Sequence, residues 1–492
     1  MHRSTIVEKR AASLPVRLST NDILHHLSAT FIAKCPALHK FRPLAVYVGS
    51  EVHVLYRLIT SETVLTTARL CATAHCARKT TRLRRSGFSY SRTPKQCATA
   101  SNCTMTGPDA VLEADDKELA IDGSVLEGGG QILRNAAALA AISAMPIKVT
   151  NIRAGRSKPG LRAQHLAGLQ LIAEVCQGKL TGGTIGSQQI SLRPQHLTSG
   201  HHIGDTKTAG SCMLLAQAAL PCLIMAQANS SPAEKMPDGQ TSTVELRGGT
   251  DAAMAPPVSY IEQVLLPMLQ RLQGVKASID LQRRGFFPKG GGRLVLSAAA
   301  LPQGACLPAI NLTNQGQVTS IRIMAHTAGK VKESVAHRMV EAARQNLKQN
   351  LKHIPIECKT VAETSATAFG DGTGIVMVAE TSTGCLLGAS GIGERGTQAE
   401  QIANTAADEL VEAIYSGACV DQWLQDQLII FMALADGESR MSCTEPTLHT
   451  RTAMVIAEQL TAAEFAVQKP AGRHQCWQIH CQGAGLPAGK HG

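Results

Sequence analysis

Residues 127–134 read Glu-Gly-Gly-Gly-Gln-Ile-Leu-Arg, and residues 153–162 read Arg-Ala-Gly-Arg-Ser-Lys-Pro-Gly-Leu-Arg. The first run opens an alanine-rich segment, which predicts a helix that Met145-Pro146 stops and a short apolar strand after it. Glycine lets backbone amides approach an anion without a Cβ in the way. The N-terminus of the helix would turn its unpaired N–H groups toward the same place.

The second run supplies cationic side chains beside a rigid Pro-Gly turn. Guanidinium groups suit phosphate oxygens because they donate two parallel hydrogen bonds. We therefore interpret the two runs as one phosphate-binding cleft, with these candidate ligands: Arg134, Arg153, Arg156, Lys158 and Arg162. A plain glycine turn and a solvated cationic loop fit the same spacing, so the residues alone leave both interpretations open.

Strand and helix patterns alternate on both sides of this stretch, which predicts an α/β fold. The elements expected up to residue 272 are strands at 119–121 and 190–192, a helix at 161–175 capped by Gly178, a helix at 211–220, a buried strand at 221–226 and a helix at 258–272. Similar units recur along the chain, but no repeat is provable from the sequence itself.

Residues 305–415 read as a separate α/β module. Its expected elements are strands at 318–325, 374–379 and 385–389 and helices at 333–351 and 397–415. The remaining chain predicts a helix at 422–435, a loop at 447–450, a helix through 458, and strands near 467 and at 477–481.

Residues 1–113 lack this pattern. An alternating Val, Leu and Tyr pattern from 44 to 70 predicts a strand pair. The basic cluster at 78–85 fits nuclear import, RNA contact or a solvated tail. Cys71, His75 and Cys76 have no second pair at zinc-finger spacing, so we expect no metal there.

Six strings, in a fixed order, carry a resemblance to the RNA 3'-terminal phosphate cyclase family. They are DGSVLEGGGQILR (122–134), RAGRSKPGLRAQHLAGL (153–169), DTKTAGS (205–211), LRGGTDAAMAP (246–256), RRGFFPKGGG (283–292) and AETSTGCLLG (379–388). The resemblance runs from about Ala114 to near the C-terminus. It implies a large domain of three βαβαββ units (residues 114–304 and 416–492), an inserted small α/β domain (305–415) and, outside the resemblance, a basic extension (1–113).

The family resemblance also implies an activity. It predicts an ATP-dependent enzyme that converts an RNA 3'-terminal phosphate to a 2',3'-cyclic phosphate, through a covalent histidine–AMP intermediate and an RNA adenylate. ATP is the expected substrate, Mg²⁺ or Mn²⁺ the expected cofactor, and RNA with a 3'-phosphate the expected partner. The nucleus is the expected location; a cytoplasmic pool and organelle targeting by the N-terminal extension stay open.

The charge distribution agrees with recognition of an RNA end. The formal net charge is +11, yet residues 1–110 hold 16 Lys and Arg against 5 Asp and Glu, and the remainder has 32 of each sign. A neutral core must bind RNA with a local patch, which favours an end over a long track. Fifteen scattered cysteines indicate a reducing compartment, and no apolar run approaches the roughly 18 residues of a spanning helix.

His449 is the candidate nucleophile. It precedes a predicted helix, whose amides can hold an adjacent phosphate, and imidazole offers an unprotonated nitrogen near neutral pH. A single histidine among 17 is more often structural. The resemblance assigns His449 to the position of the histidine that carries AMP.

Trp423, Asp426 and Gln427 have helical spacing and share one face, which suits a purine and its ribose or an ordinary amphipathic helix. By resemblance all three line the nucleotide site. The family commonly has tyrosine at the first position, so Trp423 keeps a stacking surface and lacks the phenolic hydroxyl. Gln217, which interrupts an apolar run, and Pro256 are implied adenine contacts.

Glu127 is the candidate metal ligand, through a Mg²⁺ bound to triphosphate oxygens, although a carboxylate here also suits a helix cap. The loop from Lys289 to Arg293 repeats the glycine pattern. It fits either contact with the RNA end or a turn packed under the cleft.

Two other functions fit parts of the same pattern. A non-catalytic branch of the superfamily acts in ribosome assembly and lacks the catalytic histidine; His449, Gln217, Asp426 and Gln427 argue against it. An enolpyruvyl transferase shares the repeated-unit architecture and is an analogy of fold alone.

Overall fold

The computed structural model describes residues 43–48, 51–56, 118–227, 241–470 and 476–489. The chain divides into two units, Met1–Pro108 and Asp109–Gly492. In the first, β1 (Pro43–Val48) and β2 (Glu51–Tyr56) pair antiparallel, as the alternating pattern predicted. The basic cluster at 78–85 and the group Cys71, His75 and Cys76 lie outside the described residues.

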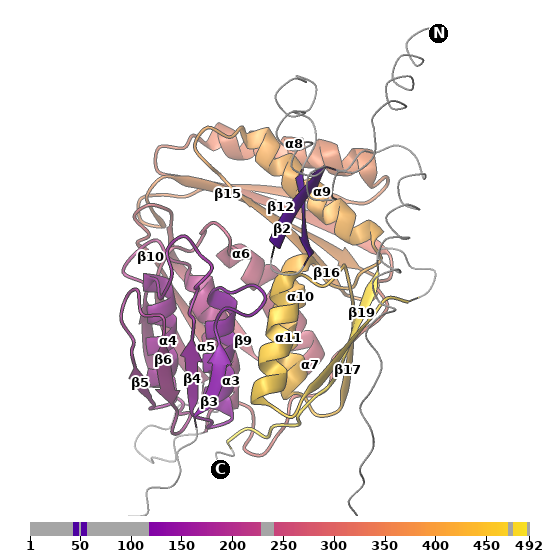
Figure 1. Cartoon of the computed structure of the whole chain (residues 1–492). Coiled ribbons are helices and arrows are strands. Elements are labelled where there is room, and N and C mark those ends of the chain that lie inside the picture. Colours follow the sequence, from indigo (N-terminus) through magenta and orange to yellow (C-terminus); the bar gives the residue numbers. More distant parts are fainter. Residues whose placement is uncertain (1–42, 49–50, 57–117, 228–240, 471–475, 490–492) are drawn as a thin grey trace, which may run out of the picture. The chain divides into compact units, whose positions relative to one another are not determined.

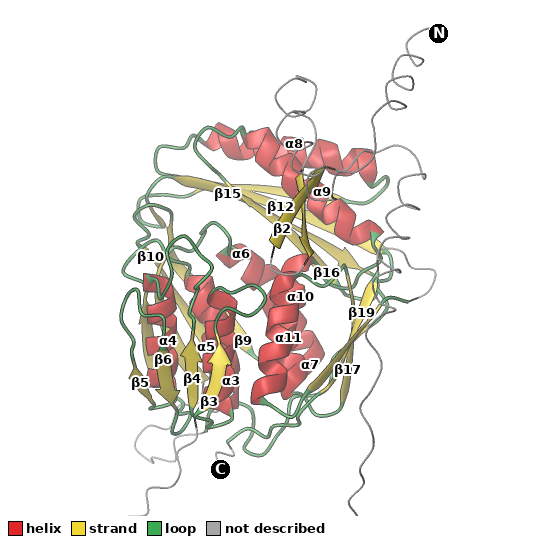
Figure 2. Ribbon diagram, in the orientation of Figure 1, coloured by secondary structure: helices red, strands yellow, loops and turns green. Residues whose placement is uncertain are grey.

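Four mixed sheets form the described part of the second unit, which makes it an α/β fold (Figures 1 and 2). The first sheet has the order β3 (Leu119–Asp122), β4 (Ile147–Thr150), β6 (Ile190–Arg193), β5 (Lys179–Thr181). The second has β14 (Ala368–Phe369), β9 (Ala277–Gly285), β10 (Gly292–Ala299), β8 (Thr241–Gly248), β7 (His201–Asp205).

The third sheet has the order β11 (Asn311–Leu312), β17 (Glu438–Cys443), β19 (Trp477–Gln482), β18 (Glu464–Gln468). The fourth has β13 (Ile356–Ala362), β12 (Val318–Ala328), β15 (Gly372–Thr381), β16 (Leu386–Ile392). Leaving β14 aside, the first three sheets share one arrangement. A parallel pair of the first two strands along the chain is followed by the fourth and then the third strand.

The helices pack on these sheets and on each other (Figure 2). Around the first three sheets lie α3 (Gly130–Ile142), α4 (Ala163–Val175), α5 (Cys212–Met225), α10 (Gln422–Leu434) and α11 (Leu448–Leu460). The predicted helix at 258–272 consists of α6 (Val258–Tyr260), a π-helical segment (Ile261–Leu265) and α7 (Leu266–Gln273). They share one apolar core.

The fourth sheet is covered by α8 (Glu333–Asn350) and α9 (Ala399–Tyr415), which pack against each other. Both helices are amphipathic, and they place residues such as Met339, Leu347 and Leu410 in an apolar core distinct from the one above. Figure 1 shows this layer at the top of the view, above α6 and α10.

The prediction of a strand at 221–226 was wrong. The helix α5 continues through Pro221 to Met225. Proline inside a helix removes one N–H donor and costs about 3 kcal/mol. Twelve of the fourteen residues of α5 are buried, and burial of this apolar segment outweighs the local cost.

The predicted cap of α4 was also misplaced. The residue in the left-handed conformation is Gln177, with φ +48°, and not Gly178. Gly178 follows it and donates its N–H to Ala173 O at 2.7 Å, which satisfies one carbonyl of the last turn.

Within the described residues, no helix combines the length and apolar character needed to cross a bilayer. The ten cysteines that the structure describes are all free thiols.

Candidate active site

An open cleft of about 870 Å³ lies where the first turns of α3, α4, α10 and α11 face one another. Ten predicted site residues line it: Glu127, Arg134, Arg153, Arg156, Arg162, Gln217, Pro256, Trp423, Asp426 and His449. Gln427 does not line it, and neither does Lys158.

The glycine run forms the N-terminal end of α3. The residue before the helix is Gly129, which has no side chain to accept from the first amides, so these N–H groups point into the cleft without a cap. The run is tied to the far end of the chain: Glu127 donates its backbone N–H to Thr452 Oγ1 of α11 at 3.3 Å. This bond holds the glycine run beside the helix that carries His449.

The loop at 151–160 forms the opposite wall. Arg153 has φ +53° and donates through Nη1 to the carbonyl oxygens of Lys158 (2.8 Å) and Gly160 (3.0 Å), so it closes its own loop. A Cβ on Gly160 would lie 2.1 Å from Gly186 O, which is why this position takes only glycine. Lys158 therefore contributes a carbonyl to the loop and no side chain to the cleft.

Arg156 links the loop at 151–160 to the glycine run. Its Nη2 donates to Glu127 Oε1 at 2.6 Å and to the backbone oxygen of Glu127 at 3.1 Å. Half of the Arg156 side chain stays exposed, so the same guanidinium can still bind an anion in the cleft.

A partly buried chain of hydrogen-bonded polar side chains lines the inner surface of the cleft. Arg134 donates to Gln131 Oε1, and Gln131 donates through Nε2 to Asp426 Oδ2 at 2.9 Å. Burial lowers the pKa of Arg134, an effect opposed by Asp426 and Glu127. Burial also raises the pKa of Asp426 to about 7, because Arg134 and Gln131 offset only part of the loss of water.

We expect Asp426→Asn to change how stability depends on pH. The folded pKa of Asp426 lies above the unfolded value, so its contribution to stability is full below about pH 4 and is lost as pH rises to about 7. Asparagine cannot ionise and still accepts from Gln131. The free energy of unfolding of the variant relative to wild type should therefore increase over this range, by roughly 2–4 kcal/mol.

Urea unfolding of both proteins across this pH range measures that difference, in which the titrating groups that do not interact with Asp426 cancel. A variant whose stability runs parallel to that of the wild type at every pH would show that Asp426 ionises normally.

His449 also lines the cleft. It is the second residue of α11, so it lies in the first turn of the helix that it was predicted to precede. The helix is capped by Thr447, whose side chain accepts from Thr450 N at 3.1 Å. The ring is accessible from the cleft, while partial burial and the charges of Arg134 and Arg156 lower the pKa of His449 and Glu127 opposes them. The unprotonated form is therefore the major one at neutral pH.

The start of α11 is held by Gln425 of α10, which is fully buried. Its Oε1 accepts from Thr447 N at 2.9 Å and from Thr450 Oγ1 at 2.5 Å. The start of α10 is fixed in turn by Asp421, whose carboxylate accepts from Trp423 N (2.8 Å) and from Tyr260 Oη (2.7 Å). The two helix starts that carry His449 and Trp423 are thus held by buried side chains.

The three residues of α10 that were predicted to line the nucleotide site do not all reach the cleft. Trp423 and Asp426 line the cleft, but Gln427 lies in a small adjoining cavity that also contacts Gln131 and Gln217. Gln427 Nε2 donates back to Trp423 O at 2.5 Å, and its buried Oε1 has no hydrogen-bond partner among the described residues. A ligand in the cleft therefore reaches Gln427 only by entering this cavity.

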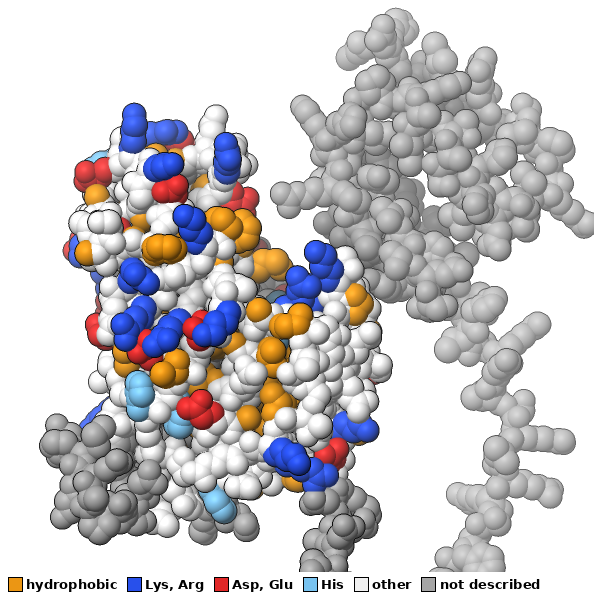
Figure 3. All heavy atoms as spheres, turned by 90° about the vertical axis from the view of Figure 1, so that its left-hand side faces the viewer, with side chains coloured by type: hydrophobic (Ala, Val, Ile, Leu, Met, Phe, Trp, Pro, Cys, Tyr) orange, Lys and Arg blue, Asp and Glu red, His pale blue; other side chains and the backbone are white. Residues whose placement is uncertain are grey.

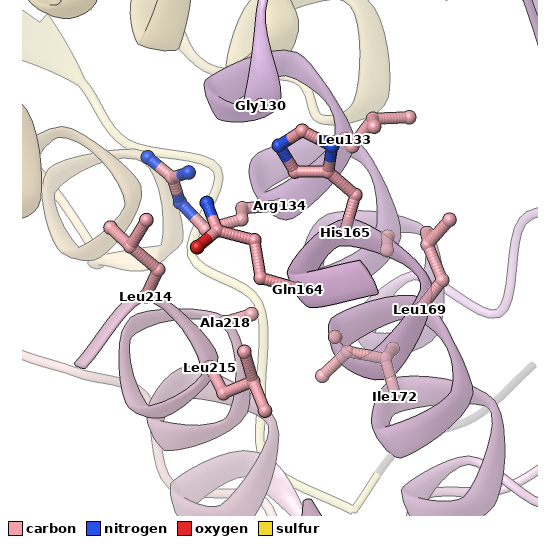
Figure 4. A pocket seen from close by; sticks show the side chains of 12 residues that line it. Gly130, Leu133, Arg134, Gln164, His165, Leu169, Ile172, Leu214, Leu215 and Ala218 are labelled. Atoms are coloured by element: carbon pink, nitrogen blue, oxygen red, sulfur yellow. The ribbon is translucent and has the colours of Figure 1, made fainter. Parts of the chain in front are cut away.

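Sequence reasoning missed Gln131, Gln164 and His165. Figure 4 shows Gln164 and Arg134 turned toward one another at the mouth of a narrow, mainly apolar pocket between α3, α4 and α5. His165 lies beside Gly130, and its Nδ1 accepts from Arg162 N at 3.2 Å. Burial and the neighbouring arginines lower the pKa of His165 to about 3, so it stays neutral. Helical spacing from Arg134 and Arg162 was the available signal.

A resident metal site is not evident among the described residues, where no three His, Cys, Asp or Glu side chains are grouped for one. Glu127 nevertheless fits a single contact, because its buried Oε2 finds no hydrogen-bond partner in the part of the chain that the structure describes, while Oε1 accepts from Arg156. Mg²⁺ is commonly held by one or two carboxylates together with substrate phosphates and water. Glu127 suits a cation that arrives with a polyphosphate.

Comparisons with known proteins point to one family over most of the chain. A model of the RNA 3'-terminal phosphate cyclase family matches residues 125–467. A probable RNA 3'-terminal phosphate cyclase of Dictyostelium discoideum is 37% identical over 397 residues, which cover 79% of this chain and 88% of the relative. RNA 3'-terminal phosphate cyclases of Pyrobaculum aerophilum (36%) and Drosophila melanogaster (35%) match 74% and 75% of this chain and 98% of their own length.

Proposed function

Because the chain belongs to the RNA 3'-terminal phosphate cyclase family, we propose that it is itself an ATP-dependent cyclase that converts an RNA 3'-phosphate to a 2',3'-cyclic phosphate. One observation carries the proposal beyond family membership. An accessible, largely unprotonated His449 shares its cleft with Arg134, Arg153, Arg156 and Arg162 and with the uncapped amides of α3.

In the first step, an imidazole nitrogen of His449 attacks the α-phosphorus of ATP. A P–N bond forms, the bond from the α-phosphorus to the bridging oxygen breaks, and pyrophosphate leaves. The amides at the start of α3 and the guanidinium groups of Arg134 and Arg156 offset the negative charge that develops on the phosphate oxygens. Trp423 supplies an aromatic plane for the adenine, with Gln217, Pro256 and Asp426 along the same wall.

In the second step, an oxygen of the RNA 3'-phosphate attacks the histidine-bound phosphorus and releases the imidazole. In the third, the neighbouring 2'-hydroxyl loses its proton and attacks the RNA phosphorus, and AMP leaves with the electrons of the broken P–O bond. Arg153 and Arg162, on the opposite wall, are assigned to the RNA phosphate. A divalent cation at Glu127 would supply neutralising charge to the triphosphate.

The architecture implied by the family remains part of the proposal. The shared strand order of three sheets supports three βαβαββ units, and the separate core of the fourth sheet supports an inserted domain within 305–415, between parts at 114–304 and 416–492. The strand β11, although it lies in the range 305–415, pairs with β17 and belongs to the third sheet. The location in the nucleus stays a prediction.

The decisive assay offers the purified protein ATP, Mg²⁺ or Mn²⁺ and a short RNA with a 3'-phosphate. We expect release of one AMP and one pyrophosphate per end and a product resistant to phosphatase, because the cyclic diester has no terminal monoester. The matched RNA with a 3'-hydroxyl should give no product. Binding to pre-ribosomal proteins without AMP release from 3'-phosphorylated RNA would favour the non-catalytic alternative.

A further inference from the structure

A second, basic cavity opens beside the cleft, on the outer face of the second sheet. It has a volume of about 410 Å³, and five cationic side chains line it: Lys207, Arg247, Arg283, Lys289 and Arg293. We call these five residues the sheet-2 basic surface. Figure 3 views the side of the molecule on which β10 lies and shows Lys and Arg side chains in a row there, with a few acidic side chains among them.

Strand register brings three of these five cations together. Arg293 of β10 lies opposite Arg247 of β8 on one side and opposite Arg283 of β9 on the other. Neighbouring strands are about 4.8 Å apart, so the three guanidinium groups lie close together at one end of the three strands. Like charges placed opposite one another destabilise a sheet, so this cluster costs stability unless carboxylates or a bound anion offset its charge.

A buried carboxylate holds part of the row in place. Glu245 Oε1 lies 2.6 Å from Arg247 Nε and 2.8 Å from Arg293 Nε, and hydrogen bonds from these two arginines lower the pKa of Glu245 to about 2. Lys207 pairs with Asp205 at 2.7 Å. Two carboxylates thus face five cations, and the surface keeps an excess of positive charge.

The uncompensated charges lie beside exposed aromatic rings. Arg283 and Lys289 lie over the ring of Phe369, at 5.4 and 5.8 Å from its centroid, and neither forms an ion pair within the part of the chain that the structure describes. Phe369 is 41% exposed, and Phe287, in the same loop as Lys289, is 80% exposed. Proteins that bind single-stranded nucleic acid combine cationic side chains along the phosphate backbone with aromatic rings that stack on the bases.

The surface is continuous with the cleft. Thr208 lines both cavities, from the loop that joins β7 to α5. The glycine loop after β9 packs directly on it, since a Cβ on Gly290 would lie 2.4 Å from Thr208 O. A chain whose 3' end lies in the cleft therefore meets the basic residues one loop away.

We infer that the sheet-2 basic surface binds the single-stranded RNA that precedes the 3'-phosphate, with its backbone on the five cations and a base on Phe287 or Phe369. The inference rests on the proposed function for the position of the RNA end. It also gives the electrically neutral part of the chain, with 32 charges of each sign, the local patch that RNA binding requires.

The double variant Lys207→Gln/Lys289→Gln tests this surface without disturbing the buried Glu245. Its matched control is Lys348→Gln/Lys352→Gln, which removes two exposed charges at the end of α8. Fluorescence anisotropy with a 3'-phosphorylated RNA of about 12 nucleotides, titrated at several salt concentrations, gives Kd and its salt slope. We expect the surface variant to bind roughly tenfold or more weakly at 0.1 M salt, with a slope smaller by about 1.4, and the control to match wild type.

Activity assays separate this inference from the proposed function. The surface variant should form the protein–AMP adduct with ATP alone, and should cyclise a 3'-phosphorylated dinucleotide, at wild-type rates, while its KM for the longer RNA rises about tenfold. Phe287→Ala should weaken binding of the longer RNA without changing the salt slope. If wild type forms no adduct, the proposed function fails, and the anisotropy titrations still test the surface.

Equal RNA affinities and salt slopes for the surface variant, the control and wild type would overturn the inference. So would an equal loss of activity on the dinucleotide and on the longer RNA, because that result would assign Lys207 and Lys289 to the cleft.

Discussion

Replacing His449 by alanine should abolish the transfer of AMP from ATP to the protein. The imidazole nitrogen is the group that forms the P–N bond, and water cannot replace it in a covalent adduct. We expect the yield of adduct, and with it RNA cyclisation, to fall by at least about 10³-fold, as when the nucleophile of another enzyme is removed. Incubation with α-labelled ATP followed by denaturing electrophoresis measures the adduct.

The substitution should leave the fold intact. His449 is exposed at the second position of α11, and the side chains that hold this helix start, Gln425 and Thr447, are untouched. Exposed substitutions of this kind usually change stability by less than about 0.5 kcal/mol. His337→Ala, which removes an exposed histidine on α8, is the matched control and should label as wild type does.

Acid should release the label from wild type and alkali should not, since that behaviour distinguishes a phosphoramidate from a phosphate ester. The lowered pKa of His449 has a further consequence. The nucleophilic, unprotonated form persists below pH 6.5, so the rate of adduct formation should begin to fall only at a more acidic pH than for free imidazole. Label that survives in His449→Ala would move the nucleophile to another residue.

Local sequence signals predicted the elements that local physics controls. The glycine run and the alanine-rich segment after it define α3, which ends before Met145-Pro146 as expected. Pro221 misled because its cost is local, whereas the burial that overrides it comes from helices and strands distant in sequence. A periodic sequence pattern does not show how much apolar surface a segment will bury in the folded protein.

The cleft could be predicted only in part. Spacing identified the glycine run and the arginine loop, but they meet α11 through a bond between Glu127 and Thr452, which are 325 positions apart. Only the family resemblance brought His449 to the same place. Helical spacing also put Gln427 with Trp423 and Asp426, yet the cleft meets a narrower part of that face, and Gln427 turns back to its own helix.

The spacing of residues along the sequence could not predict the sheet-2 basic surface. The loop from Lys289 to Arg293 stood out in the sequence, but Arg247 joins it through the register of β8 and β10, and Lys207 through a loop between β7 and α5. The consecutive residues Arg283 and Arg284 also differ in a way that their spacing does not predict. Arg283 faces outward to Phe369, while Arg284 is buried in an ion network.

That network is the basis for the second large effect that we expect. Arg284 Nη1 lies 3.2 Å from Asp251 and its Nε lies 2.8 Å from Glu363, with side-chain exposures of 6%, 0% and 12% for the three residues. Arg284 also donates to Ser259 Oγ at 2.9 Å. Because Glu363 follows β13 and Asp251 precedes α6, the network ties the fourth sheet to the body that carries the cleft.

Arg284→Met should lower the free energy of unfolding by about 3–5 kcal/mol at neutral pH, because it leaves two buried carboxylates without a cation. Arg283→Met, the adjacent arginine on the opposite face, loses one hydrogen bond to Gly291 O and should cost only about 1 kcal/mol. Urea unfolding of both variants measures the contrast. Similar losses for the two would mean that the network contributes no more than an ordinary surface arginine.

The pH dependence of this loss identifies its cause. Burial raises the pKa of Asp251, but the charge of Arg284, aided by His326, holds it below its usual value. In wild type the carboxylate therefore contributes stability above pH 3.8 that is lost only as pH falls through its folded pKa. Without Arg284 burial dominates, the pKa moves upward, and the variant should lose stability as pH rises. The difference from wild type should shrink toward acid, and Asp251→Asn introduced into Arg284→Met should restore part of the stability at neutral pH.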